Sequence, residues 1–169
     1  MIIVRTLRAS AQRGFVELGP FRLPCALGQT GIRALKREGD GATPRGRFPL
    51  RFAFYRPDAG RPKAALPLKA MRRSSGWCDS ATDRNYNRAV ALPYPASAER
   101  MWRSDGLYDV VVVVGYNERP RVKGRGSAIF MHVARDGLNP TEGCVALRLG
   151  DLRRLLAVLP RNSEIVILA

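Results

Sequence analysis

Five consecutive valines at residues 110–114 constrain the fold of this chain more than any other feature. Valine is β-branched and favours extended backbone, and a run without polar alternation is typical of a strand buried on both faces. The run is far too short to cross a bilayer as a helix, and we predict no membrane span. The sequence therefore predicts a central strand at 109–116, with a second strand of this kind at 127–133.

Short apolar or alternating segments bounded by turn residues predict further strands at 2–4, 14–18, 21–27, 48–55 and 164–168. One helix is predicted from an Asp151 N-cap to Leu159, with Leu152, Leu155 and Leu156 completing its apolar stripe. A short helix or turn is predicted at 98–102. Many short strands with few helices favour a mainly β fold, a β-sandwich or open barrel with one or two short helices, in a single domain over residues 1–169.

The chain is strongly basic, with 29 Lys and Arg against 14 Asp and Glu and a net charge of +15. This charge predicts attraction to polyanions, among which nucleic acid, anionic lipid and bacterial wall polymers are all eligible, or simply a solvated basic surface. The arginines are scattered, and the sequence has no helix-turn-helix, zinc-finger spacing or ribonucleoprotein motif. We therefore expect no nucleic-acid partner.

The cysteines number three, Cys25, Cys78 and Cys144, with no CxxC pair and a single histidine. This set cannot build a usual zinc shell, so we predict neither a metal nor a cofactor. Cys25 lies in an apolar run and is expected to pack as a small hydrophobe, although a bond between Cys25 and Cys78 remains an alternative.

His132 and Cys144 are the residues with the clearest chemical potential. A thiol is a weak nucleophile until an imidazole takes its proton, after which it attacks a carbonyl to form a thioester. A lone histidine in an apolar strand is usually structural, but Gly137 and Pro140 predict a loop that returns the chain so that the two side chains meet. Gly143 before the cysteine lets backbone amides approach a developing oxyanion.

Residues 131–133 and 141–148 resemble the L,D-transpeptidases of the YkuD type, whose mark is a strand-borne His, a loop, and Gly-Cys followed by a small apolar run and an Arg. The family usually has His where Glu142 stands and Arg where Ala146 stands. Residues 41–48 are similar to the Thr-Pro-x-Gly-x-Phe element of the same domain. The resemblance covers roughly the whole chain and implies the same mainly β fold.

The resemblance implies that the Cys144 thiolate attacks an L-centre carbonyl of a peptidoglycan stem peptide and that an amine of a second stem resolves the thioester. His132 would be the base, held by the carbonyl of Val133, and the amides of Gly143 and Cys144 would bind the oxyanion. Arg148 would bind a substrate carboxylate. The crosslink would join two diaminopimelates, or L-Ala to diaminopimelate, and carbapenems would acylate the cysteine.

A polar and aromatic insertion at about 56–105 is predicted to cap the substrate. Its aromatics would cover the substrate, or alternatively plug the core beneath a long loop. Glu142 would steer the acceptor amine, or is simply an exposed loop carboxylate. The full set of predicted substrate contacts is Met131, Arg148, Glu142, Trp77, Asn85, Tyr86 and Asn87.

A wall enzyme that supports cell-wall biogenesis and cell shape would act in the periplasm, although the N-terminal sequence does not look like a signal peptide. Two other functions compete with transfer. A carboxypeptidase or other hydrolase at the same site would use water in place of the amine. A non-catalytic module would instead bind polyanions through its +15 charge.

Overall fold

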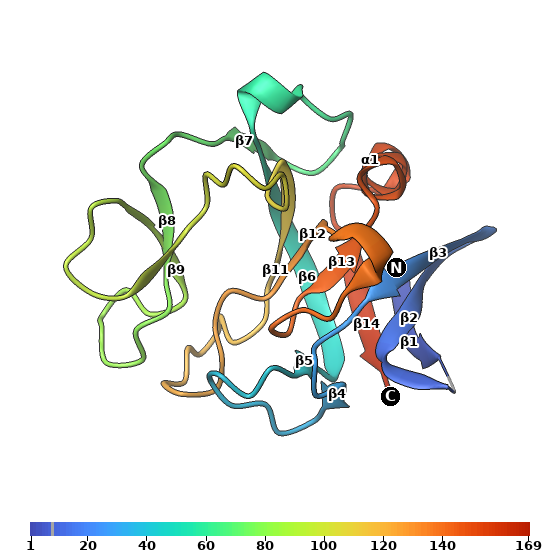
Figure 1. Ribbon diagram of the computed structural model, residues 1–169, viewed down its shortest axis with the longest axis horizontal. Helices are drawn as coiled ribbons and strands as arrows, with labels where there is room; N and C mark the ends of the chain where they lie inside the picture. Colours follow the sequence, from blue (N-terminus) through green and yellow to red (C-terminus); the bar gives the residue numbers. More distant parts are fainter. Residues whose placement is uncertain (8) are drawn as a thin grey trace.

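Most strands of the computed structural model, which describes residues 1–7 and 9–169, belong to one sheet (Figure 1). Its order is β11-β12-β13-β3-β2-β1-β14-β6-β7, and β6 also pairs with β11, so that the sheet closes into a barrel-like ring. The mainly β prediction is therefore confirmed. The strands are β1 (Ile2–Leu7), β2 (Ser10–Leu18), β3 (Phe21–Ala26), β6 (Gly46–Tyr55), β7 (Leu68–Ala70), β11 (Val110–Val114), β12 (Phe130–Val133), β13 (Val145–Leu147) and β14 (Glu164–Leu168).

The five valines form β11, and all of them are buried. The strand is antiparallel to β12 on one side and to β6 on the other, so that its backbone groups are paired in the interior of the sheet. The prediction of a strand buried on both faces is confirmed. Its neighbour β12 begins at Phe130, three residues later than the predicted start at 127.

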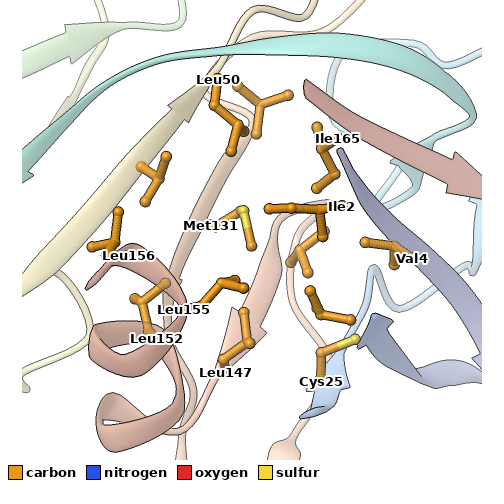
Figure 2. Packing of buried hydrophobic residues seen from close by; sticks show 14 of the residues in the cluster. Ile2, Val4, Cys25, Leu50, Met131, Leu147, Leu152, Leu155, Leu156 and Ile165 are labelled. Carbon is orange, nitrogen blue, oxygen red and sulfur yellow. The ribbon is translucent and has the colours of Figure 1, made fainter. Parts of the chain in front are cut away.

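In the part of the chain that the structure describes there is one α-helix, α1 (Leu149–Val158), which packs its leucine stripe against the sheet (Figure 2). Leu152, Leu155 and Leu156 are buried, as predicted. The prediction of Asp151 as N-cap was wrong, because the chain passes from β13 almost directly into the helix and Arg148 occupies the cap. Asp151 lies in the first turn, where its charge favours the helix dipole. Across residues 1–7 and 9–169, no helix is long and apolar enough to span a membrane.

Two smaller sheets flank the main one. A parallel pair joins β4 (Ile32–Arg33) to β5 (Thr43–Pro44). The other has the order β10-β8-β9 and lies apart from the main sheet on the left of Figure 1. The prediction of a helix or turn at 98–102 was wrong, because the backbone there pairs with β8 as a short strand. This sheet comprises β8 (Ser75–Cys78), β9 (Arg88–Ala91) and β10 (Ala98–Arg100), and short 3-10 turns occupy Pro57–Ala59 and Asp136–Leu138.

All three cysteines are free thiols in the structure. Cys25 lies in β3 with no exposed surface and packs within the main core cluster, as predicted for a small hydrophobe. Burial raises the pKa of the Cys25 thiol to about 12, which keeps it protonated.

Candidate active site

Adjacent parallel strands bring His132 and Cys144 to one face of the sheet. In the β12–β13 ladder Met131 pairs with Val145 and His132 with Ala146, so that Cys144, one residue before β13, comes level with Phe130. Alternate residues of a strand share a face, which places both chemical groups on the same side. Both side chains line one cavity of about 670 Å³.

The imidazole of His132 is held in a single tautomer. Its Nδ1 lies 2.8 Å from the carbonyl oxygen of Val133, an acceptor, so that Nδ1 carries the proton and Nε2 keeps its lone pair. Tyr108 packs edge-on against the ring with centroids 5.3 Å apart. The pKa of His132 is lowered to about 4, chiefly by burial and in part by the nearby charge of Arg103. The hydrogen bond to the Val133 carbonyl opposes this shift. The resting imidazole is therefore a neutral base.

Cys144 is a protonated thiol in the resting site. Its Sγ donates to the carbonyl oxygen of Ala128 at 3.3 Å and accepts from the amide of Phe130 at 3.4 Å. Burial, together with the charge of Glu99, raises the pKa of the thiol to about 12. The thiol and the imidazole therefore both favour their neutral forms in this environment.

The turn before the cysteine requires glycine. Gly143 has φ of +127°, and a Cβ at this position would meet the carbonyl oxygen of Ala42 at 2.5 Å. The hydroxyl of Thr141 accepts from the Gly143 amide at 3.1 Å and donates to the Cys144 carbonyl at 2.7 Å. Since the Gly143 amide is already occupied, the amide of Cys144 is the better candidate for an oxyanion donor.

Charged groups of both signs surround the cavity. This balance differs from that of the whole chain, in which basic residues outnumber acidic ones by two to one. The cationic residues of the lining are Lys36, Arg103 and Arg135, and the acidic ones are Glu38, Asp79, Glu99 and Glu142.

The predicted contacts from the insertion lie behind the cavity rather than in its lining. Trp77 and Tyr86 are buried, and Trp77 packs edge-on against Phe130. The side-chain oxygen of Asn87 accepts from the Trp77 indole at 3.0 Å and from the amide of Ala128 at 3.1 Å. Asn87 therefore fixes the residue whose carbonyl holds the cysteine thiol.

Asn85 and Tyr86 also form side-chain hydrogen bonds within the protein. The side-chain amide of Asn85 donates to the hydroxyl of Tyr94 at 2.8 Å. The hydroxyl of Tyr86 donates to the carboxylate of Glu38 and accepts from the amide of Gly126 at 3.0 Å. Tyr86 thus ties the insertion to the loop that carries Glu38, one of the cavity-lining carboxylates.

The remaining predicted contacts divide between core, surface and cavity. Met131 is fully buried within the main core, opposite the face that carries His132 (Figure 2). Arg148 is exposed at the start of α1 and does not line the cavity. Glu142 does line it, and its carboxylate accepts from the side-chain amide of Gln29 at 2.9 Å.

Several cavity residues carried no signal in the sequence. Tyr108 donates its hydroxyl to Glu99 at 2.5 Å, and Arg103 lies over the Tyr108 ring. These residues come from segments 79–108 that lack hydrophobic periodicity, and their convergence depends on how the insertion folds back. No spacing rule could have singled them out.

A buried thiol and a neutral imidazole that face one cavity are typical of cysteine acyl-transfer sites. The family model for the L,D-transpeptidase catalytic domain, YkuD, matches residues 10–167. The chain therefore belongs to the L,D-transpeptidase catalytic domain family. Among curated protein sequences, none matches it.

Similar solved structures include an L,D-transpeptidase from Mycobacterium smegmatis, at 15% identity and a TM-score of 0.44. Bd1075 of Bdellovibrio bacteriovorus has 15% identity and a TM-score of 0.49, and L,D-transpeptidase 1 of Mycobacterium tuberculosis has 13% and 0.43. Each match covers 99% of this chain, which spans 58%, 47% and 59% of these three chains respectively.

Proposed function

We propose that this protein is a cysteine acyltransferase that crosslinks peptidoglycan stem peptides through a thioester on Cys144. The observation that carries the proposal is the shared cavity of Cys144 and His132, in a chain that belongs to the L,D-transpeptidase catalytic domain family. The product joins two diaminopimelates or joins L-Ala to diaminopimelate. Its place of action is the cell wall, in the periplasm.

Acylation starts when His132 Nε2 takes the proton of the Cys144 thiol. The thiolate attacks the carbonyl carbon that follows the L-centre of the donor stem, and the Cys144 amide stabilises the oxyanion. Collapse of this intermediate breaks the C–N bond, and His132 returns the proton to the departing amine. The enzyme keeps the donor as a thioester.

The substrate carboxylate is bound by Arg103 or Arg135 in this proposal, and not by Arg148. Both of these guanidinium groups line the cavity, whereas Arg148 is exposed outside it. A guanidinium pairs with a carboxylate through charge-assisted hydrogen bonds. Arg135 lies two residues after the end of β12 and three residues after His132.

The insertion at about 56–105 forms the cap over the substrates, within the single domain of residues 1–169. Asp79, Glu99 and Arg103 line the cavity from this segment, whereas the aromatic residues Trp77 and Tyr86 support it from behind. The cap thus presents charged groups to the substrate, which suits a zwitterionic stem peptide better than an apolar one.

The direct test is an intact mass spectrum after incubation with a carbapenem and, separately, with a donor stem peptide. We expect one adduct on the wild-type protein and none on Cys144→Ala, with the two proteins unfolding at similar temperatures. Incubation of donor with acceptor should then yield crosslinked dimers. An unshifted wild-type mass with both reagents contradicts the proposal.

Product analysis separates transfer from its two rivals. Trimmed donor without dimers would assign the site to a hydrolase. Binding to anionic polymer that weakens with salt and persists in Cys144→Ala, in the absence of any acylation, would assign the chain to the polyanion-binding class.

A further inference from the structure

The small sheet of the insertion places two carboxylates, Asp79 and Glu99, in the cavity lining. Glu99 lies on β10, and Asp79 directly follows β8, the strand with which β10 pairs. The amide of Asp79 donates to the carbonyl of Ser97 at 3.3 Å and so extends this antiparallel ladder. Asp79 and Glu99 are therefore diagonal neighbours on one face, with Cβ atoms about 7 Å apart.

Polar atoms at this cavity lack partners within the protein. The Oδ1 atom of Asp79 is buried and has no hydrogen-bond partner among residues 1–7 and 9–169. The same holds for the hydroxyl of Ser127, a cavity-lining residue that is only 6% exposed. Buried polar atoms are normally paired, so these two are free to form hydrogen bonds with water or with polar groups of a ligand.

The electrostatic setting favours a cationic ligand group. Burial raises the pKa of the Glu99 carboxyl, and the negative charge of Asp79 also raises it. The hydrogen bond from the Tyr108 hydroxyl and the charge of Arg103 act in the opposite direction and lower this pKa. A cation placed between the two carboxylates would stabilise both charges. The chain as a whole, at +15, repels cations, so that this pair of carboxylates is a local exception.

We propose that Asp79 and Glu99 bind the ammonium group of the acceptor and thereby favour transfer to an amine over hydrolysis by water. The inference rests on the acyl transfer proposed above and adds the acceptor site to it. Water carries no charge and gains nothing from the two carboxylates. An amine bound by the two carboxylates is concentrated in the same cavity that Cys144 lines.

Transfer of the acyl group from the thioester to the amine needs no further reagent. The bound ammonium loses one proton to bulk water, and the lone pair of the neutral nitrogen attacks the thioester carbonyl carbon. A C–N bond forms, the C–S bond breaks, and the electron pair of that bond stays on the Cys144 sulfur. His132 takes the second nitrogen proton and delivers it to the thiolate, which restores the resting thiol.

Removal of the Glu99 charge has opposite effects on the two half-reactions. The charge raises the pKa of the Cys144 thiol, so Glu99→Gln should make the thiolate easier to form. Acylation is then undiminished or faster, while acceptor use falls. Damage to the fold would instead slow both steps, so the direction of the two changes identifies the cause.

The experiment compares wild type, Asp79→Asn and Glu99→Gln, with a donor stem tetrapeptide and an acceptor stem that has a free amine. Acyl-enzyme formation is followed by intact mass, and the ratio of dimer to hydrolysed donor is measured over a range of acceptor concentrations. In both variants we expect the acceptor concentration for half-maximal dimer formation to rise about tenfold or more. Glu164→Gln is the matched control, because this carboxylate is 43% exposed on β14 and does not line the cavity.

Three results would overturn this acceptor site. One is a wild-type ratio of dimer to hydrolysed donor in both variants with acylation intact. Another is a lower ratio in Glu142→Gln alone, which would assign the amine to that carboxylate instead. The third is a parallel loss of acylation and dimer in both variants, which would make the two carboxylates structural. Absence of acyl-enzyme in the wild type is a separate outcome, and it removes the proposed function itself.

Discussion

Protonation of His132 should destabilise the folded protein by about 3 kcal/mol. Burial lowers the pKa of this imidazole from 6.5 to about 4, and each tenfold change in proton affinity corresponds to about 1.4 kcal/mol. The unfolded chain binds the proton near pH 6.5 and the folded chain only near pH 4. Between these values the unfolded state holds more protons, so the stabilisation is complete above pH 6.5 and is lost as the pH falls toward 4.

Urea unfolding of wild type and His132→Gln at a series of pH values measures this effect. Glutamine does not titrate, and its amide can still donate toward the Val133 carbonyl, so the variant serves as the reference at each pH. All other titrating groups are shared and cancel in the difference. The free energy of unfolding of the wild type, relative to the variant, should fall by about 3 kcal/mol between pH 7.5 and pH 4. A difference that stays constant across this range would refute the assignment of a buried, neutral imidazole.

Three further predictions concern the site. Because His132 stays neutral down to a pKa of about 4, carbapenem acylation of Cys144 should lose half its rate near pH 4 to 5, and an acidic limb near pH 6.5 in a pH–rate profile would contradict this. Gly143→Ala should slow acylation more than about tenfold and destabilise the protein by about 1–3 kcal/mol, because φ is +127° and the carbonyl of Ala42 blocks the new Cβ; normal kinetics would contradict the glycine requirement. Thr141→Val should cost about 1–3 kcal/mol in urea unfolding through two lost hydrogen bonds, whereas Thr141→Ser should retain them.

Every strand that the sequence predicts has a buried face, but β8 and β13, which are also largely buried, are too short, at four and three residues, for a pattern to show. Residues 110–114 and 164–168 contribute apolar side chains to the core, and this leaves an unmistakable pattern. The strand β9 has no fully buried residue, and β10 has none either. Such strands are held by backbone hydrogen bonds to β8, which every sequence can make, so residues 98–102 gave no usable signal.

The residues that line the cavity also differ in how well the sequence could predict them. His132 and Cys144 could be singled out because an imidazole and a thiol lie on either side of one loop, within 12 positions of each other, and this pair suits acyl transfer. Asp79, Glu99 and Arg103 are ordinary charged residues in a polar segment. Their role depends on the path of the insertion, which pairs β10 with β8 and turns this edge toward the thiol. Local pattern contains no information about that path.

Side chains alternate between the two faces of a strand, so Met131, which precedes His132, faces the core and cannot also face the substrate. Along β12, Phe130 and His132 point toward the cavity side, while Met131 packs among the leucines of α1 (Figure 2). A slip of one residue in the β12 register would put the imidazole in the apolar core and the methionine in the cavity. Met131 has 0% exposure, and its burial therefore stabilises the register of β12 as well as the sheet. The same packing that fixes the register of β12 also places the imidazole of His132 on the side of the sheet where Cys144 lines the same cavity.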